Sequence, residues 1–194
     1  MKEESTSATW RVFCAIELPE SLKSQIAQHI NSLRSATKAN ASWSLPHNIH
    51  LTLKFLGEVE LDRIASVSNA ATAAVSSLAP FKVRVEGTGV FPPRGAPRVL
   101  WIGLNDLEGK LSELHAHFEV EFAKAGFPKE SRPFRPHLTL ARLRKPTSAS
   151  ALAAAHKERP FKPGDITVSE VAVIRSELSS KGSKYTTISR HPLT

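Results

Sequence analysis

The tetrapeptide His-Leu-Thr-Leu stands at residues 50–53 and again at residues 137–140. Each copy lies in a stretch whose composition favours a β-strand. Because the side chains of a strand alternate between its two faces, the histidine and the threonine of each copy point to one side and the two leucines point to the other. The repeat therefore predicts two similar strands, each anchored by leucines and each presenting an imidazole and a hydroxyl to one surface.

The segments around the repeat mix helix and strand patterns without strict strand-helix-strand alternation. Such a mixture is typical of an α+β fold with largely antiparallel sheets. Residues 1–9 are expected to form a short flexible tail and residues 10–194 a single domain, and the segments 43–45 and 50–59 are expected to pair around a turn. The other expected strands are 10–18, 81–91, 98–104, 137–143, 166–174 and 184–189, and the expected helices are 22–33, 61–78, 107–122 and 148–158.

Composition limits the class of protein. The chain has 194 residues, of which 41% are hydrophobic and 23% charged, and this is ordinary globular composition that excludes a largely disordered or fibrous chain. The net charge of +8 favours an anionic partner such as a nucleic acid. Cys14 is the single cysteine and lies in an apolar run, so the sequence supports neither a disulfide framework nor a cysteine-based metal site. The single cysteine favours a reducing, cytoplasmic compartment, and no signal peptide or membrane-spanning stretch is apparent, so we expect no contact with a membrane. Single-domain packing without an obvious apolar surface pattern suggests a monomer.

Two imidazoles and two hydroxyls that face one another suit acid-base chemistry at phosphorus. Imidazole exchanges a proton readily near neutral pH, so one ring can act as a general base and the other as a general acid. A threonine hydroxyl beside each ring can donate a hydrogen bond to an oxygen that develops negative charge. The sequence thus favours in-line displacement at a phosphate ester, and the basic net charge fits a substrate that carries phosphate.

Nearly the whole chain resembles the 2H phosphoesterase superfamily, which is defined by two His-x-Thr-x motifs. Within that superfamily it is most similar to the bacterial and archaeal RNA 2′,3′-cyclic phosphodiesterases, also called 2′-5′ RNA ligases. The resemblance implies two pseudo-symmetric α+β lobes, with one motif from each lobe meeting in a central cleft. The matching stretches are residues 11–16, 50–58, 91–93, 97–101, 134–142, 176–178 and 182–185.

The resemblance also implies a role for each site residue. His50 would be the proton donor to the leaving ribose 3′ oxygen, and His137 the proton acceptor that activates water against the cyclic phosphate. Thr52 and Thr139 would bind the non-bridging oxygens, and Arg142 would add positive charge. The implied substrate is RNA with a 2′,3′-cyclic phosphate end, the implied product a 2′-phosphate, and no metal or other cofactor is required. The alternatives are a 2′-5′ RNA ligase, an enzyme that acts on another 2′-5′ or small cyclic nucleotide, and an RNA-binding module without catalysis.

Strict alternation along the strands leaves two positions in question. Counting from His137 places Arg142 on the face opposite the site, so its implied role needs a bulge or a strong twist after Leu140. Counting from His50 places Lys54 on the site face, although an exposed lysine near a strand end is the more ordinary interpretation.

Two aromatic residues and a further histidine are weaker candidates. Phe13 is expected in the core, although it could stack on a base, and for Tyr185 the two interpretations have similar weight. His47 is interpreted as an exposed turn residue. The remaining histidines have no evident partners along the sequence, and His115 and His117, two residues apart on an expected helix, make a poor metal pair.

Overall fold

The computed structural model describes residues 8–37, 39–143, 146–180 and 182–194. Of the tail expected over residues 1–9, residues 1–7 lie outside the described residues, and Thr9 already belongs to the first strand. No described helix is long and apolar enough to cross a lipid bilayer.

The described residues form nine strands, four α-helices and two short 3-10 helices. Most bounds agree within a few residues with the expectations from the sequence, and β4 and β6 have the expected bounds. The strands are β1 Thr9–Glu17, β2 Ala41–Trp43, β3 His50–Glu60, β4 Phe81–Phe91, β5 Val99–Asn105, β6 His137–Leu143, β7 Gly164–Val168, β8 Glu170–Ser179 and β9 Gly182–Pro192. The helices are α1 Glu20–Ala36, α2 Ile64–Val75, α3 Lys110–Lys124 and α4 Pro146–Glu158, with the short 3-10 helices η1 Pro46–Asn48 and η2 Leu61–Arg63.

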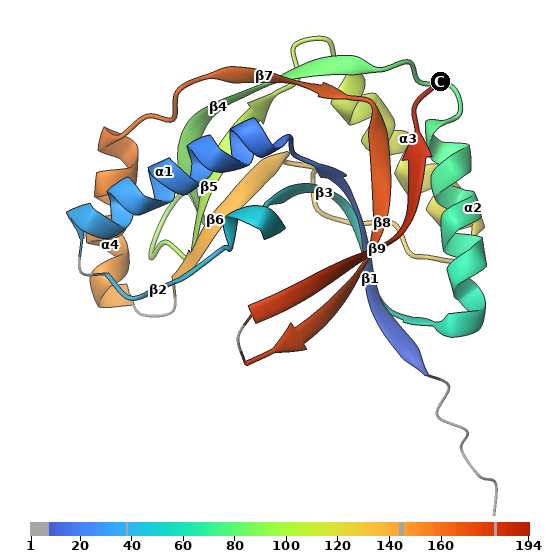
Figure 1. Ribbon diagram of the computed structural model, residues 1–194, viewed down its shortest axis with the longest axis horizontal. Helices are drawn as coiled ribbons and strands as arrows, with labels where there is room; N and C mark the ends of the chain where they lie inside the picture. The colour runs from blue at the N-terminus through green and yellow to red at the C-terminus, as the bar shows by residue number, and fades with distance from the viewer. Residues whose placement is uncertain (1–7, 38, 144–145, 181) are drawn as a thin grey trace, which may run out of the picture.

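The strands form two antiparallel sheets. The four-stranded sheet has the order β3-β1-β8-β9, and the five-stranded sheet has the order β2-β6-β5-β4-β7. Figure 1 shows α2 and α3 on the side of β8 and β9, and α1 with α4 on the side of β4, β5 and β6. The expectation of an α+β fold with largely antiparallel sheets is therefore confirmed.

Two expectations about the strands were wrong, one about which segments pair and one about where a strand ends. The segments around residues 43–45 and 50–59 do not pair, because η1 carries the chain from one sheet to the other: β2 pairs with β6, whereas β3 pairs with β1. The segment 166–174 is not one strand, since it breaks at Ser169 into β7 and β8, which lie in different sheets. Each sheet thus takes strands from both halves of the chain, and the two lobes are interleaved rather than consecutive.

A β-bulge interrupts each motif strand at the fourth residue of the tetrapeptide. In β3, Thr52 is opposite Ala15 and Lys54 is opposite Cys14, so Leu53 is an extra residue. In β6, Thr139 and Ala141 are opposite consecutive residues of β5 in the same way, and Leu140 is extra. An extra residue reverses the faces of the side chains that follow it.

The bulge in β3 overturns both interpretations of Lys54. Its side chain neither faces the site nor lies exposed, because it turns into the interior and is 5% exposed. Lys54 Nζ donates hydrogen bonds to Glu119 Oε1 of α3 at 2.7 Å and to the carbonyl oxygen of Pro128 at 2.9 Å. Glu119 Oε2 in turn accepts a hydrogen bond from the backbone N–H of Glu130 at 2.9 Å. This buried ion pair ties β3 to α3 and to the segment that leads into β6.

Removing one partner of this pair should destabilise the fold strongly. In the Lys54→Met variant the Glu119 carboxylate, whose side chain is 13% exposed, loses its counter-charge, and we expect the free energy of unfolding to fall by about 3–5 kcal/mol. The double variant Lys54→Met/Glu119→Met should recover most of the loss, because two apolar side chains can replace a buried ion pair. Urea unfolding followed by circular dichroism measures both values.

The matched control is the exposed pair between Lys110 and Glu113. The Lys110→Met variant should leave the free energy of unfolding almost unchanged, since exposed ion pairs contribute little. Similar losses in Lys54→Met and Lys110→Met would contradict the assignment of Lys54 to the interior.

Candidate active site

A cleft of about 480 Å³ lies where the two sheets face each other. His50 enters it from β3 of the four-stranded sheet, and His137 enters it from β6 of the five-stranded sheet. Thr52 and Thr139 line the same cleft, as alternation along each strand requires. The structure therefore brings together both copies of the repeated tetrapeptide, although they lie on different sheets.

The two imidazoles are held in the same way. His50 Nδ1 lies 2.8 Å from the carbonyl oxygen of Asn48, and His137 Nδ1 lies 2.7 Å from the carbonyl oxygen of Arg135. A carbonyl oxygen can only accept a hydrogen bond, so Nδ1 of each ring carries the proton. Nε2 of each ring has no hydrogen-bond partner among the described residues and is the atom left to exchange a proton with a ligand.

The surroundings of the two rings differ. Phe13 stacks on His50 with the ring centres 4.7 Å apart, and Tyr185 approaches the same imidazole edge-on at 5.4 Å. This burial lowers the pKa of His50, even though the Asn48 carbonyl and the Glu17 carboxylate both favour the protonated ring. His137 has a single described ring neighbour, Phe91, which contacts it edge-on at 5.0 Å.

Arg142 lines the cleft with the two histidines. The bulge at Leu140 turns Ala141 into the core and Arg142 toward the site, as the sequence required for its expected position. Its guanidinium makes no ion pair or hydrogen bond with any described residue. The threonine hydroxyls of the two motifs are likewise without a hydrogen-bond partner in the described part of the chain. These three side chains can donate hydrogen bonds to an anion bound between the imidazoles.

The bulge in β3 also places an unexpected residue at the site. Phe55 occupies the position in β3 that Arg142 occupies in β6, and it lines the cleft with 63% of its surface exposed. Leu178 of β8 lines the cleft as well and is 68% exposed. Large apolar side chains with this exposure suit contact with a nucleobase. Neither residue was predicted at the site from the sequence, since the position of Phe55 depends on the bulge and that of Leu178 on the β8–β9 hairpin.

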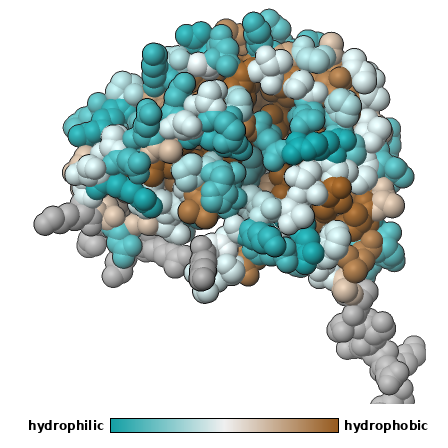
Figure 2. Space-filling model, viewed as in Figure 1, coloured by the Kyte–Doolittle hydropathy of each residue, from teal (hydrophilic) through white to brown (hydrophobic). Residues whose placement is uncertain are grey.

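Trp43 and Leu45, from the segment that contains β2, complete the apolar lining of the cleft. Figure 2 shows hydrophobic residues between hydrophilic ones near the middle of the molecule and in a patch at its lower right. The cleft therefore combines a cationic and hydrogen-bonding centre with an apolar rim.

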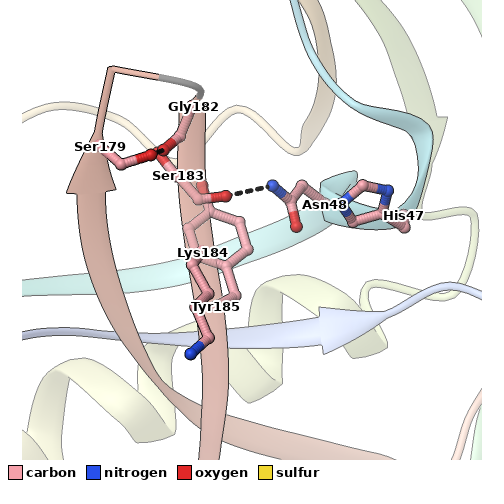
Figure 3. Close-up of a pocket in the computed structure, with 7 residues that line it drawn as sticks. All are labelled: His47, Asn48, Ser179, Gly182, Ser183, Lys184 and Tyr185. Carbon is pink, nitrogen blue, oxygen red and sulfur yellow. Dashed lines mark hydrogen bonds between the residues drawn. The ribbon is translucent and has the colours of Figure 1, made fainter.

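A side pocket of about 320 Å³ adjoins the cleft beside the β8–β9 hairpin (Figure 3). Asn48 Nδ2 donates a hydrogen bond to the carbonyl oxygen of Ser183 at 2.7 Å and so ties η1 to β9. His47 lines this pocket and is exposed, in agreement with its interpretation as an exposed turn residue. Tyr185 lines both the pocket and the cleft, whereas Phe13 is buried beneath His50, as expected of a core residue.

The structure gives partners to histidines for which the sequence indicated none. His29 Nε2 lies 3.3 Å from His156 Nδ1, and His191 is within hydrogen-bonding distance of Thr72 and Ser189. Within the described residues, no three or more His, Cys, Asp or Glu side chains come close enough together to hold a metal ion. Cys14 is buried, and this burial raises the pKa of its thiol.

Curated relatives match the chain over almost its full length. It is 35% identical over 177 residues to an RNA 2′,3′-cyclic phosphodiesterase of Methanothermobacter thermautotrophicus, covering 91% of this chain and 95% of that protein. It is 33% identical over 190 residues to the protein of the same name from Thermus thermophilus, covering 94% and 90%.

A solved structure matches the fold. The crystal structure of E. coli LigT complexed with 3′-AMP superimposes with a TM-score of 0.77 at 26% identity, covering 96% of this chain and 99% of that one. The family model of the 2′-5′ RNA ligase superfamily matches residues 22–179, which include both histidine motifs, Arg142 and Leu178. By sequence and by fold, the chain belongs to the 2′-5′ RNA ligase superfamily.

Proposed function

We propose that this protein hydrolyses RNA 2′,3′-cyclic phosphate ends to 2′-phosphates. The observation that carries the proposal is the matched pair of imidazoles in one cleft, each with Nδ1 bonded to a backbone carbonyl and Nε2 left to exchange a proton. Two such groups can serve the attacking and the leaving oxygen of one displacement at phosphorus. The relatives named RNA 2′,3′-cyclic phosphodiesterase support the same substrate class.

In the proposed reaction His137 is the general base and His50 the general acid. His137 Nε2 takes a proton from water as the water oxygen forms a bond to phosphorus. The bond between phosphorus and the ribose 3′ oxygen breaks, and His50 Nε2 gives its proton to that oxygen. The phosphate stays on the 2′ oxygen, and each proton transfer has a side chain assigned to it, so the scheme calls for no metal ion.

The remaining site residues stabilise the charge that develops on the phosphate. The hydroxyls of Thr52 and Thr139 donate hydrogen bonds to the two non-bridging oxygens, and Arg142 adds a positive charge beside them. Phe55, Leu178 and Tyr185 provide apolar contact for the terminal nucleoside.

The same residues would serve a second displacement of the ribose 3′ oxygen, in which an RNA 5′ hydroxyl attacks phosphorus in place of water and a 2′-5′ linkage forms. The family name favours this second activity as an alternative. An RNA-binding module without catalysis is the third possibility, and the two matched imidazoles argue against it, because binding alone does not require both. The monomeric state and the cytoplasmic location expected from the sequence stay predictions.

The position of the phosphate in the product tests the proposed function. An RNA oligonucleotide with a 2′,3′-cyclic phosphate end should yield a 2′-phosphate, because the proposed proton donor serves the 3′ oxygen. Mass spectrometry combined with resistance of the product to a 3′-specific phosphatase identifies this end. Formation of a 3′-phosphate would reverse the assigned leaving oxygen, and joined 2′-5′ products would favour the ligase.

Substitution of the motif residues tests the mechanism. His50→Ala and His137→Ala should each abolish hydrolysis, and Thr52→Ala or Thr139→Ala should lower kcat by roughly 10²-fold, the usual cost of losing one donor to a developing negative charge. EDTA should leave the rate unchanged. The assay is steady-state hydrolysis of a cyclic-phosphate RNA by each purified variant.

The matched control for the histidine variants is His117→Ala, on α3, which should retain the full rate. Circular dichroism should show that all variants keep the fold. Undiminished turnover in His50→Ala or His137→Ala, or inactivation by EDTA, would contradict the mechanism.

The lowered pKa of His50 gives a prediction about pH. In the free protein the imidazole of His50 should lose its proton below pH 6.5, because burial disfavours its charged form. A bound phosphate places negative charge beside the ring and should raise this pKa. We expect a proton NMR titration to show both effects, with adenosine 2′-phosphate as the ligand and His50→Gln to assign the signal. A pKa of 6.5 or higher in the free protein would show that the ring is not desolvated.

A further inference from the structure

The face of the five-stranded sheet that carries His137 continues past this histidine onto two more aromatic residues. Trp101 of β5 is opposite Thr139 of β6 on one side and opposite Gly89 of β4 on the other. Directly opposed residues of antiparallel strands point to the same face, so the indole lies on the face of the catalytic cleft. Phe91 lies between His137 and Trp101, since its ring centre is 5.0 Å from that of His137 and 5.2 Å from that of Trp101.

Two glycines let the indole lie flat on the sheet. A Cβ added to Gly89 would come within 2.7 Å of Trp101 Cε2, and one added to Gly103 would lie 2.8 Å from the carbonyl oxygen of Glu86 and 3.3 Å from Trp101 Cζ3. Neither glycine has the positive φ that would require glycine for its backbone. Glycine inside a strand weakens the strand and often marks a close approach of another group. These two positions therefore provide the space in which the ring covers both strands.

Beside the indole is an open depression of about 740 Å³ that belongs to neither the cleft nor the side pocket. Phe161 lines it together with Trp101, while Thr88, Asn105 and Lys162 provide polar and charged groups. The indole is half-buried, and its Nε1 is buried without a hydrogen-bond partner among the described residues. The ring is thus held by packing against the sheet rather than by a hydrogen bond of its own.

We propose that Phe91, Trp101 and this depression form a second nucleotide subsite, which binds a base that precedes the cyclic-phosphate nucleotide in the RNA chain. The proposal rests on the proposed function. The terminal nucleotide occupies the cleft, and the rest of the RNA must leave it over one of the adjoining surfaces. The surface over Phe91 presents two neighbouring aromatic rings, and stacking of bases on aromatic rings is the common mode by which proteins bind single-stranded RNA. Lys162 lines the depression, where it can contact a backbone phosphate.

A comparison of substrates of two lengths tests the subsite. For each variant, kcat/KM is measured on a trinucleotide and on a mononucleotide, both with a 2′,3′-cyclic phosphate. Trp101→Ala should lower the ratio of the trinucleotide value to the mononucleotide value by about ten-fold or more, the usual contribution of one stacked base. Trp101→Phe should restore most of the ratio, because phenylalanine keeps an aromatic face. The matched control is Trp10→Ala, which removes a tryptophan that packs against Arg175 on the four-stranded sheet and should leave the ratio unchanged.

A second variant changes the surface on which the Trp101 indole packs. Gly89→Ala keeps tryptophan at position 101, but the added methyl group displaces the indole from the sheet. This variant should therefore also lower the ratio of the trinucleotide to the mononucleotide kcat/KM. An unchanged ratio in Trp101→Ala would overturn the proposal. A lowered ratio in Lys184→Ala but not in Trp101→Ala would overturn it too, because the RNA would then leave the cleft over the hairpin pocket of Figure 3.

A binding measurement separates this proposal from the proposed function. In the His137→Ala background, calorimetry with a trinucleotide and a mononucleotide that both end in a 3′-phosphate reports the subsite without turnover. Tighter binding of the trinucleotide that depends on Trp101 would support the subsite even if the cyclic phosphodiesterase activity were absent. Equal affinities for the two ligands would overturn the subsite even if that activity were present.

Discussion

One extra residue in each motif strand determines which side chains reach the cleft. Leu53 and Leu140 each add a residue to their strand that the neighbouring strand does not match. In a regular strand the residues at the third and fifth positions after the histidine would face away from it. The bulges instead bring Phe55 and Arg142 to the face of the two imidazoles. The cation beside the two imidazoles and part of the apolar rim of the cleft both depend on this local break in alternation.

The same bulges decide which side chains point into the interior beneath the site. They turn Lys54 and Ala141 inward, where alanine simply packs and lysine needs a counter-charge. Glu119 supplies it and also accepts a hydrogen bond from Glu130, in the segment that leads to His137. The pseudo-symmetry of the two lobes is thus incomplete, and it breaks at an ion pair that links the strand of His50 to the chain before His137.

The two histidines also differ in their surroundings while they share a backbone contact. In both, a carbonyl oxygen of the residue two positions earlier holds Nδ1, so the local chain conformation alone sets the tautomer. Phe13 and Tyr185 then desolvate His50, and Phe91 continues the surface beside His137 toward Trp101. Local backbone geometry therefore gives both rings the same tautomer, whereas the aromatic neighbours of the two rings differ and those of His50 help to lower its pKa.

Local patterns in the sequence were sufficient to predict the elements whose signals are local. The repeated tetrapeptide gave His50, Thr52, His137 and Thr139, because residues two apart on a strand share a face wherever that strand lies. Hydrophobic spacing gave most helices and strands within a few residues. The tertiary structure alone decided that β2 and β3 belong to different sheets, that Lys54 is buried and that Arg142, Phe55 and Leu178 line one cleft. These outcomes depend on register between strands far apart in the chain, which no local pattern records.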